Sequence, residues 1–332
     1  MRPDPKGFLF STVTLLLVAT ASQADDSLGG GFFSATLEND IFTGKDGGYT
    51  NGLGVTWGTW GLRDFSTNNL PGWMHALSRN LYISTQPGKD RAVSYTFAQA
   101  IHTPSDIKVA TLIEDEPPYA GLLSWSGHLH AFDDQVVDKL TLTLGLVGPA
   151  SDAEAAQQLV HNVTGSDEPR GWDHQLENEP VFRLSADRLW RVAAGEDVDL
   201  IGFGQVGVGT LRSNLATGIT LRYGHNLAYS FASETLPPGR DVSPVVGHSP
   251  DGWHLFVSVL GEFVANDITI DGNTFTDSHS VPLEHWQAQL AAGAVFNLDR
   301  WAVLLSAVLE TDDYEGAEQL THFGSLSVAY RY

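Results

Sequence analysis

The sequence predicts an all-β protein, a single antiparallel transmembrane β-barrel of about twelve strands that carries a short helix in an outward loop. Runs of about ten residues alternate between apolar and polar or small side chains along most of the chain. These runs exceed the roughly five or six residues of ordinary soluble strands. Trp and Tyr residues fall within the runs or near their ends, as at membrane interfaces. A soluble β-sandwich would alternate too, so run length and aromatic placement favour the barrel.

The first residues are typical of a secretory signal peptide. Arg2 and Lys6 precede an apolar core from Phe8 to Ala19, and small residues follow at Ser22 and Ala24. The apolar run is shorter than the ~20 residues that a membrane-spanning helix needs. We therefore expect cleavage after Ala24, with residues 1–24 as signal peptide and 25–332 as one barrel domain exported to the bacterial outer membrane.

Composition excludes several classes of protein. The formal net charge of −22 argues against a nucleic-acid partner, because such a partner requires a basic surface. An acidic surface instead favours divalent cations. The chain has no cysteine, so disulfide bonds cannot stabilise it. No later segment is apolar enough for a helical span, so any membrane-spanning part must be built from strands.

The predicted strands follow one another at short intervals. The last run alternates Leu326, Val328, Tyr330 and Tyr332, which resembles the C-terminal insertion signal of bacterial outer-membrane barrels. Connections at 61–91, 103–119, 148–178 and 227–252 are long, and we expect them to be the outward loops. The runs lie near 33–37, 53–57, 93–97, 123–129, 140–146, 179–191, 200–211, 216–226, 253–265, 284–296, 301–311 and 320–332.

The alternation breaks after Gly148, where the sequence predicts a short helix. Ser151 and Glu154 have the spacing of a capping box, and an apolar pattern continues to Val160. Residues four apart share a helical face, so Gln157 and His161 should project together.

Polar motifs at the ends of the first two predicted strands should meet, because these strands form a hairpin. They are Glu38-Asn39-Asp40 and Tyr49-Thr50-Asn51-Gly52. Together with later blocks, they resemble the outer-membrane lipid A 3′-O-deacylase family, and the resemblance covers essentially all of residues 25–332. The later blocks are Pro118-Tyr119-Ala120-Gly121, Gly148-Pro149-Ala150-Ser151 with Gln157 and His161, and residues 171–179.

The resemblance implies a calcium-dependent esterase of twelve strands, with its active site between the barrel wall and a helix from an extracellular loop. Its substrate would be lipid A, or lipopolysaccharide, from which it removes the ester-linked 3′-acyloxyacyl chain. The family's acidic position six residues after the histidine is Asp167 here, where glutamate is usual. The implied catalytic positions are His161, Asn39, Asp40, Thr50, Gln157 and Asp167, and the implied Ca²⁺ ligands are Asp40 and Asn39.

These residue types suit ester hydrolysis by water. No serine elbow is convincing, because Gly247-His248-Ser249-Pro250 lacks the closing glycine of Gly-x-Ser-x-Gly. His161 could then take a proton from the attacking water. Ca²⁺ prefers oxygen ligands and would polarise the ester carbonyl, while Thr50 and Gln157 could donate hydrogen bonds to the oxyanion.

Other interpretations stay open. His161 could simply pack beneath the barrel lip, and Asn39 with Asp40 could be an ordinary turn pair. An outer-membrane phospholipase would share the barrel and the calcium but needs a serine beside its histidine. A porin-like barrel without enzymatic activity would need an open lumen. We expect a monomer, the default for a small barrel.

Overall fold

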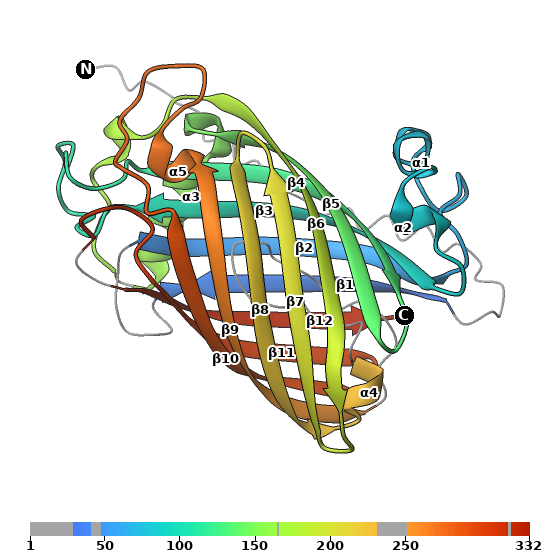
Figure 1. Cartoon of the computed structure of the whole chain (residues 1–332). Helices are drawn as coiled ribbons and strands as arrows, with labels where there is room; N and C mark the ends of the chain where they lie inside the picture. Colours follow the sequence, from blue (N-terminus) through green and yellow to red (C-terminus); the bar gives the residue numbers. More distant parts are fainter. Residues whose placement is uncertain (1–28, 41–47, 165, 231–250, 318–319) are drawn as a thin grey trace, which may run out of the picture.

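The structure, a computed structural model, is a closed barrel of antiparallel strands. It describes residues 29–40, 48–164, 166–230, 251–317 and 320–332. Within these residues, each of the twelve strands pairs with its sequence neighbours, and β1 pairs with β12 to close the sheet (Figure 1). The predicted fold class is confirmed. The predicted signal peptide, residues 1–24, lies outside the described residues.

The elements follow the predicted order of strands with a few short helices. The strands are β1 Gly30–Asn39, β2 Gly48–Leu62, β3 Asp90–Thr103, β4 Ala120–Phe132, β5 Val136–Val147, β6 Glu179–Ala194, β7 Val198–Val208, β8 Arg212–His225, β9 Gly252–Asp267, β10 Trp286–Leu298, β11 Trp301–Glu310 and β12 Thr321–Arg331. The helices are α1 Gly72–Ser78, α2 Tyr82–Thr85, η2 Pro149–Ser151, α3 Ala153–Thr164, η3 Trp172–His174, α4 Leu227–Ser230 and α5 Ile268–Asp271. None of these described helices has the length and apolarity to cross a bilayer.

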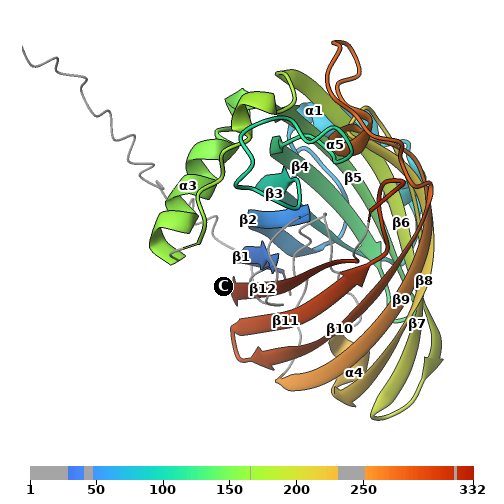
Figure 2. The same ribbon diagram turned by 90° about the vertical axis from the view of Figure 1, so that its left-hand side faces the viewer.

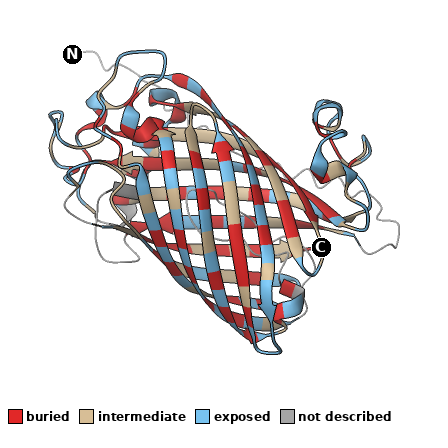
Figure 3. Cartoon of the chain, in the orientation of Figure 1, coloured by how far each residue is buried: buried red, intermediate tan, exposed pale blue. Residues whose placement is uncertain are grey.

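Along the regular parts of the strands, side chains alternate between the lumen and the outside of the wall, which gives the striped burial pattern of Figure 3. Along β9, Phe256 and Ser258 point inward and are buried, whereas Leu255 and Val257 point outward and are 49% exposed. The same outward exposure of large apolar side chains recurs on the other strands. Because this band suits lipid rather than water, the alternation supports a membrane-spanning barrel.

Inward-pointing side chains pack in the lumen, where apolar groups such as Phe203 and Phe256 lie beside many polar ones. Thr36 and Ser327 bond at 2.6 Å, and Thr56 and Thr96 bond at 2.9 Å, in both cases across neighbouring strands. His128 bonds inward hydroxyls of two strands, as expected for a polar lumen. A water-filled channel would leave such inward groups accessible, yet each of these side chains is less than 10% exposed.

The barrel has two unlike ends, and this corrects the prediction for the loops. Strands alternate in direction, so connections 103–119 and 148–178 lie at the end that carries α3, whereas 61–91 and the described ends of 227–252, at the end of β8 and the start of β9, lie at the opposite end with the C-terminus (Figure 1). Length alone cannot assign a connection to an end, because direction depends on counting strands from β1. A further long connection at the α3 end, between β9 and β10, was not predicted.

A buried ion pair supports the lumen near the C-terminal end. Arg222 is fully buried and binds Asp199 through two nitrogens, at 2.7 and 2.5 Å. The same guanidinium donates to the Ser230 hydroxyl at 3.0 Å, which ties α4 to β8.

Removing Asp199 should leave an uncompensated buried cation. We expect Asp199→Ala to lower the free energy of unfolding by about 3–5 kcal/mol, measured by denaturant titration of the folded barrel in detergent. Asp197→Ala, at an exposed position in the turn just before β7, is the control and should change the free energy of unfolding little. Equal stability of the two variants would contradict a structural role for the pair.

Candidate active site

The predicted helix forms, but it begins differently from the capping box. Ser151 ends the 3-10 turn η2, and its hydroxyl donates to the Gly148 carbonyl at 2.7 Å. Asp152 then takes a left-handed conformation, with φ of 57°, and its carbonyl accepts from Ala156 in the first turn of α3. The preceding turn therefore uses the hydroxyl that the sequence suggested as the cap, and α3 starts at Ala153.

Helix α3 lies against the outside of the barrel wall. Ile101 of β3 points outward, yet it is only 2% exposed because it packs with Ala153, Tyr119 and Trp172. Outward-pointing Gln99 donates to the Ser151 carbonyl at 2.7 Å. Figure 2 shows the helix outside the strands, running along the wall from β4 toward β1.

Gly121 of β4 makes this close approach possible. It pairs with Ile101 in the sheet. A Cβ at this position would overlap the Ser151 hydroxyl and the Ala153 methyl group. Any larger residue would hold the start of α3 away from the wall.

The predicted face of α3 is confirmed, because Gln157 and His161 are 1% and 6% exposed and lie one turn apart. The Trp172 indole nitrogen donates to Gln157 Oε1 at 2.8 Å. An indole nitrogen can only donate, so this bond fixes which way the amide points. Gln157 Nε2 is buried and makes no hydrogen bond. The site thus presents an oriented donor that lacks an acceptor.

The ring of His161 is oriented by the backbone that follows it. Nδ1 lies 2.5 Å from the Asp167 carbonyl oxygen. Because a carbonyl can only accept, Nδ1 carries the proton, and Nε2 is the basic nitrogen of the neutral ring. The Asp167 carboxylate instead pairs with Lys108 at 2.7 Å, in an exposed ion pair.

At the end of β1, a side chain that points outward, toward the lipid-facing side, is buried. Asn39 has the outward parity of Leu37, but Leu37 is 38% exposed and Asn39 is 7% exposed. The next residue, Asp40, is 1% exposed. Polar groups can occupy this outward position because protein covers it.

The sheet register relates this end to α3. Asn39 pairs with Asn51, Asn51 pairs with Ile101, and Ile101 pairs with Gly121, so one row crosses four strands. Two of the four positions, Ile101 and Gly121, contact the start of α3. Eight residues of helix, from Ala153 to His161, rise about 12 Å, whereas two strand spacings are about 10 Å. A helix running toward β1 can thus place His161 near the Asn39 end of the row.

Thr50 lies at a register irregularity of β2, between Tyr49 and Asn51. Its side chain is outside the described residues. Such an irregularity bends a strand locally and interrupts the regular alternation of its side chains.

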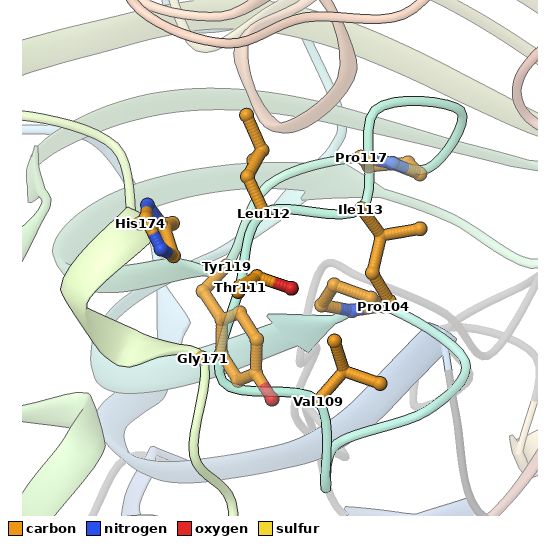
Figure 4. A pocket seen from close by; sticks show the side chains of 9 residues that line it. All are labelled: Pro104, Val109, Thr111, Leu112, Ile113, Pro117, Tyr119, Gly171 and His174. Atoms are coloured by element: carbon orange, nitrogen blue, oxygen red, sulfur yellow. The ribbon is translucent and has the colours of Figure 1, made fainter.

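Residues of two loops, 103–119 and 166–178, pack together beside the start of α3. The Tyr119 ring lies 4.9 Å from Trp172, and its hydroxyl donates to the Ile107 carbonyl at 3.2 Å. A pocket between the loops, lined by Leu112 and His174 among others, has a volume of about 10 Å³ (Figure 4). This is room for about one water molecule, so the pocket is too small for an acyl chain.

The residues at the end of β1 fit a hard cation in donor type. Asp40 offers a buried carboxylate, and Asn39 and Asn51 offer amide oxygens, which are groups that Ca²⁺ prefers. Asn51 Oδ1 is buried without a hydrogen-bond partner. Within the described ranges, no three His, Asp or Glu side chains gather closely enough to hold a metal ion, so amide oxygens would have to contribute.

Trp172 is the residue whose role the sequence did not reveal. It belongs to a recognised block, but a tryptophan in a loop gives no sign that it will orient an amide fifteen residues earlier. The contact joins two separate segments, so neither motif alone predicts it.

Comparison with known proteins identifies a family. The profile described as outer membrane protein LpxR matches residues 8–332. The structure is similar to LpxR from Salmonella typhimurium, with a TM-score of 0.72, 16% identity, and coverage of 90% of this chain and 99% of that chain. The translocator domain of the autotransporter NalP from Neisseria meningitidis gives 0.44 at 12% identity, covering 92% and 89%. No curated protein matches the sequence.

The contact at Gly121 predicts that a larger residue will displace α3. We expect Gly121→Val to lengthen the distance between spin labels on cysteines introduced at Leu159 of α3 and Leu53 of the wall, measured by pulsed electron resonance. Both positions are exposed, and the chain has no cysteine of its own. Gly261→Val is the control, because a Cβ there meets nothing within 4 Å. An unchanged distance in Gly121→Val would contradict the packing argument.

Proposed function

Since the chain belongs to the LpxR family of outer membrane proteins, we propose that it is a calcium-dependent esterase that removes the ester-linked 3′-acyloxyacyl chain of lipid A. One observation carries the proposal. His161 and Gln157 share a buried face of a helix that lies on the lipid-facing wall, and one has an assigned basic nitrogen while the other has an unpartnered donor. A site in this place suits a substrate that resides in the membrane.

The unequal ends support a site in the outer leaflet. At the C-terminal end, three of the five connections between strands are tight turns, those before β5, β7 and β11, whereas the β2–β3 and β8–β9 connections are long. At the α3 end, the connections after β3, β5 and β9 are long. Outer-membrane barrels have short periplasmic turns and longer extracellular loops, so α3 belongs on the extracellular side, where lipopolysaccharide is found.

The chemistry begins with removal of a proton from water. His161 Nε2 accepts this proton, and the resulting hydroxide adds to the ester carbonyl carbon. When the tetrahedral intermediate collapses, the bond to the sugar oxygen breaks and the imidazolium returns the proton to that oxygen. The products are a free fatty acid and a sugar hydroxyl. The bond from Nδ1 to the Asp167 carbonyl stabilises the imidazolium in the orientation that both transfers require.

Gln157 would stabilise the negative oxygen of the intermediate. Its Nε2 group is already desolvated and oriented by Trp172, so it needs no reorganisation when the charge develops. Thr50 is the proposed second donor.

Asn39, Asp40 and Asn51 would hold the calcium ion. When bound, calcium supplies a positive charge that polarises the ester carbonyl. Asp40 also supplies a negative charge that selects a cation at this end of β1, in a chain whose acidic composition already favours divalent ions.

The packed lumen favours an enzyme over a porin-like barrel, because buried side chains occupy the interior through which solutes would have to pass. A phospholipase would act on glycerophospholipids instead.

Mass spectrometry of lipid A and phospholipids from cells producing the protein, with and without a calcium chelator, separates these functions. We expect loss of the 3′-acyloxyacyl chain that stops with chelation and with His161→Ala. Continued deacylation by His161→Ala would overturn the proposal.

Asp167 provides a sharper test, because its carbonyl rather than its carboxylate contacts His161. We expect Asp167→Ala to keep deacylase activity within about fivefold, since it removes only an exposed ion pair with Lys108. Activity is measured as initial rate on purified lipid A in mixed micelles. A loss as large as that of His161→Ala would show that the carboxylate takes part in the reaction.

Trp172 and Gln157 should act as one unit. We expect Gln157→Ala to lower kcat by about 10²–10³ and Trp172→Phe by about tenfold, because the latter releases the amide without removing it. The double variant should be no slower than Gln157→Ala alone. Trp60→Phe, at a buried aromatic position inside the barrel, is the control. Additive losses would show that the indole acts independently of the amide.

A further inference from the structure

A second helical element covers the outside of the wall, at the end opposite α3. Residues 63–89, between β2 and β3, contain α1 and α2, which project from the side of the barrel in Figure 1. Met74 and Ile83 of these helices pack on Val93, Leu129 and Ala131, all of which point outward from β3 and β4. The element therefore lies where lipid would otherwise contact the wall.

Hydrogen bonds from two arginines of the barrel hold residues 63–89 in place. Arg91 is 6% exposed and donates to the carbonyls of Arg63, Lys89, Gln86 and Ser84 at 2.7, 3.0, 2.6 and 3.4 Å. At its outer end, Arg188 donates to the Tyr82 hydroxyl at 2.6 Å. Residues 63–89 thus present a fixed surface.

An aromatic row of the barrel continues onto this surface. Trp57 of β2, Tyr95 of β3 and Trp125 of β4 follow one another at ring separations of 6.0 and 5.9 Å. Trp73 of α1 is the next member, 6.1 Å from Trp125. Rows of this kind lie at the membrane interface of barrels, and so α1 is continuous with the interface on this side.

The two helical covers are α3 at one end of the wall and α1 with α2 at the other. Their separation along the barrel is close to the thickness of a membrane. On β3, Ile101 lies beneath α3 and Val93 lies beneath α1 and α2. Eight residues of strand span about 27 Å, or about 20 Å along the membrane normal at the usual tilt of about 40°. The apolar band of such barrels is about 25 Å tall, so the two covers stand near opposite interfaces.

Helix α1 is amphipathic along its two flanks. Met74 and Ser78 face the wall and are buried. Trp73 and Leu77 form an adjacent flank and are 47% and 68% exposed. Arg79, the residue that follows the helix, is exposed to solvent. Leu81 and Tyr82, 42% and 61% exposed, extend the apolar side beyond the helix.

We propose that residues 63–89 are an interfacial lipid-binding element of the periplasmic leaflet, in which the Trp73 and Leu77 flank is immersed at the boundary between headgroups and acyl chains. The partner is the phospholipid surface itself. Its recognition chemistry is apolar burial beside the existing aromatic row, with Arg63 and Arg79 left among the headgroup phosphates. The proposal does not depend on the esterase function.

The absence of cysteine in the chain permits a direct test with single introduced cysteines. Leu77→Cys, labelled with an environment-sensitive fluorophore in the full barrel reconstituted in phospholipid vesicles, is probed with two quenchers: a lipid with a doxyl group near the headgroup, and aqueous iodide. Leu221→Cys, on the lipid-facing wall at 51% exposure, is the membrane control. Asp134→Cys, exposed in a tight turn at the same end as α1, is the water control.

We expect the Leu77 label to be quenched by the lipid reagent as strongly as the Leu221 label and several-fold more than the Asp134 label, with little quenching by iodide. Strong iodide quenching with weak lipid quenching would overturn the proposal and leave this face in water. Weak quenching by both reagents would also overturn it, because it would mean that a protein or a second copy of the chain covers α1. Circular dichroism of each labelled variant shows whether the barrel has folded.

Discussion

Closure of the sheet between β1 and β12 is the constraint on which the rest of the structure depends. In lipid, an unpaired backbone N–H or C=O group has no water to bind, so only a sheet without edges can span. Closure also fixes the register that sets Asn39 opposite both Gly324 and Asn51. A slip of one residue would turn Leu37 into the lumen and Glu38 into lipid, and it would separate the polar row at the rim.

The candidate site lies on the outer face of the wall, where polar groups are normally costly. Asn39 and Gln99 point toward lipid by the alternation of their strands, and both lie where α3 or its neighbours cover the sheet. The protein that covers these polar side chains changes their interaction energies in two ways. It replaces lipid with hydrogen-bond partners such as the Ser151 carbonyl, and it keeps bulk water from screening Gln157 and His161. A substrate entering from the membrane could reach such a site without passing through the lumen.

Alternation and motif spacing predict much of this fold, because both follow from local rules. The twelve runs correspond to twelve strands, and the i to i+4 spacing places Gln157 and His161 on one buried face. The features that the sequence does not predict depend on contacts between distant segments. Glu179 resembles a solvated loop charge, yet it is 3% exposed and accepts N–H bonds from the connection after α5. Likewise, nothing local indicates that Asp167 orients His161 through its carbonyl.

An exposed apolar stretch of wall lies between α3 and the element formed by α1 and α2, both of which pack on β3. Phe97 of β3 is 50% exposed and lies midway between Ile101 and Val93, which the covers bury. Leu53 and Trp57 of β2 add an apolar surface beside it, at 53% and 41% exposure. The acyl chains of a lipid whose headgroup lies at α3 would extend down this surface toward the aromatic row. A rigid element at the other interface would then hold the depth of the barrel constant, so that the ester of a lipid anchored in the outer leaflet meets His161 at a fixed height.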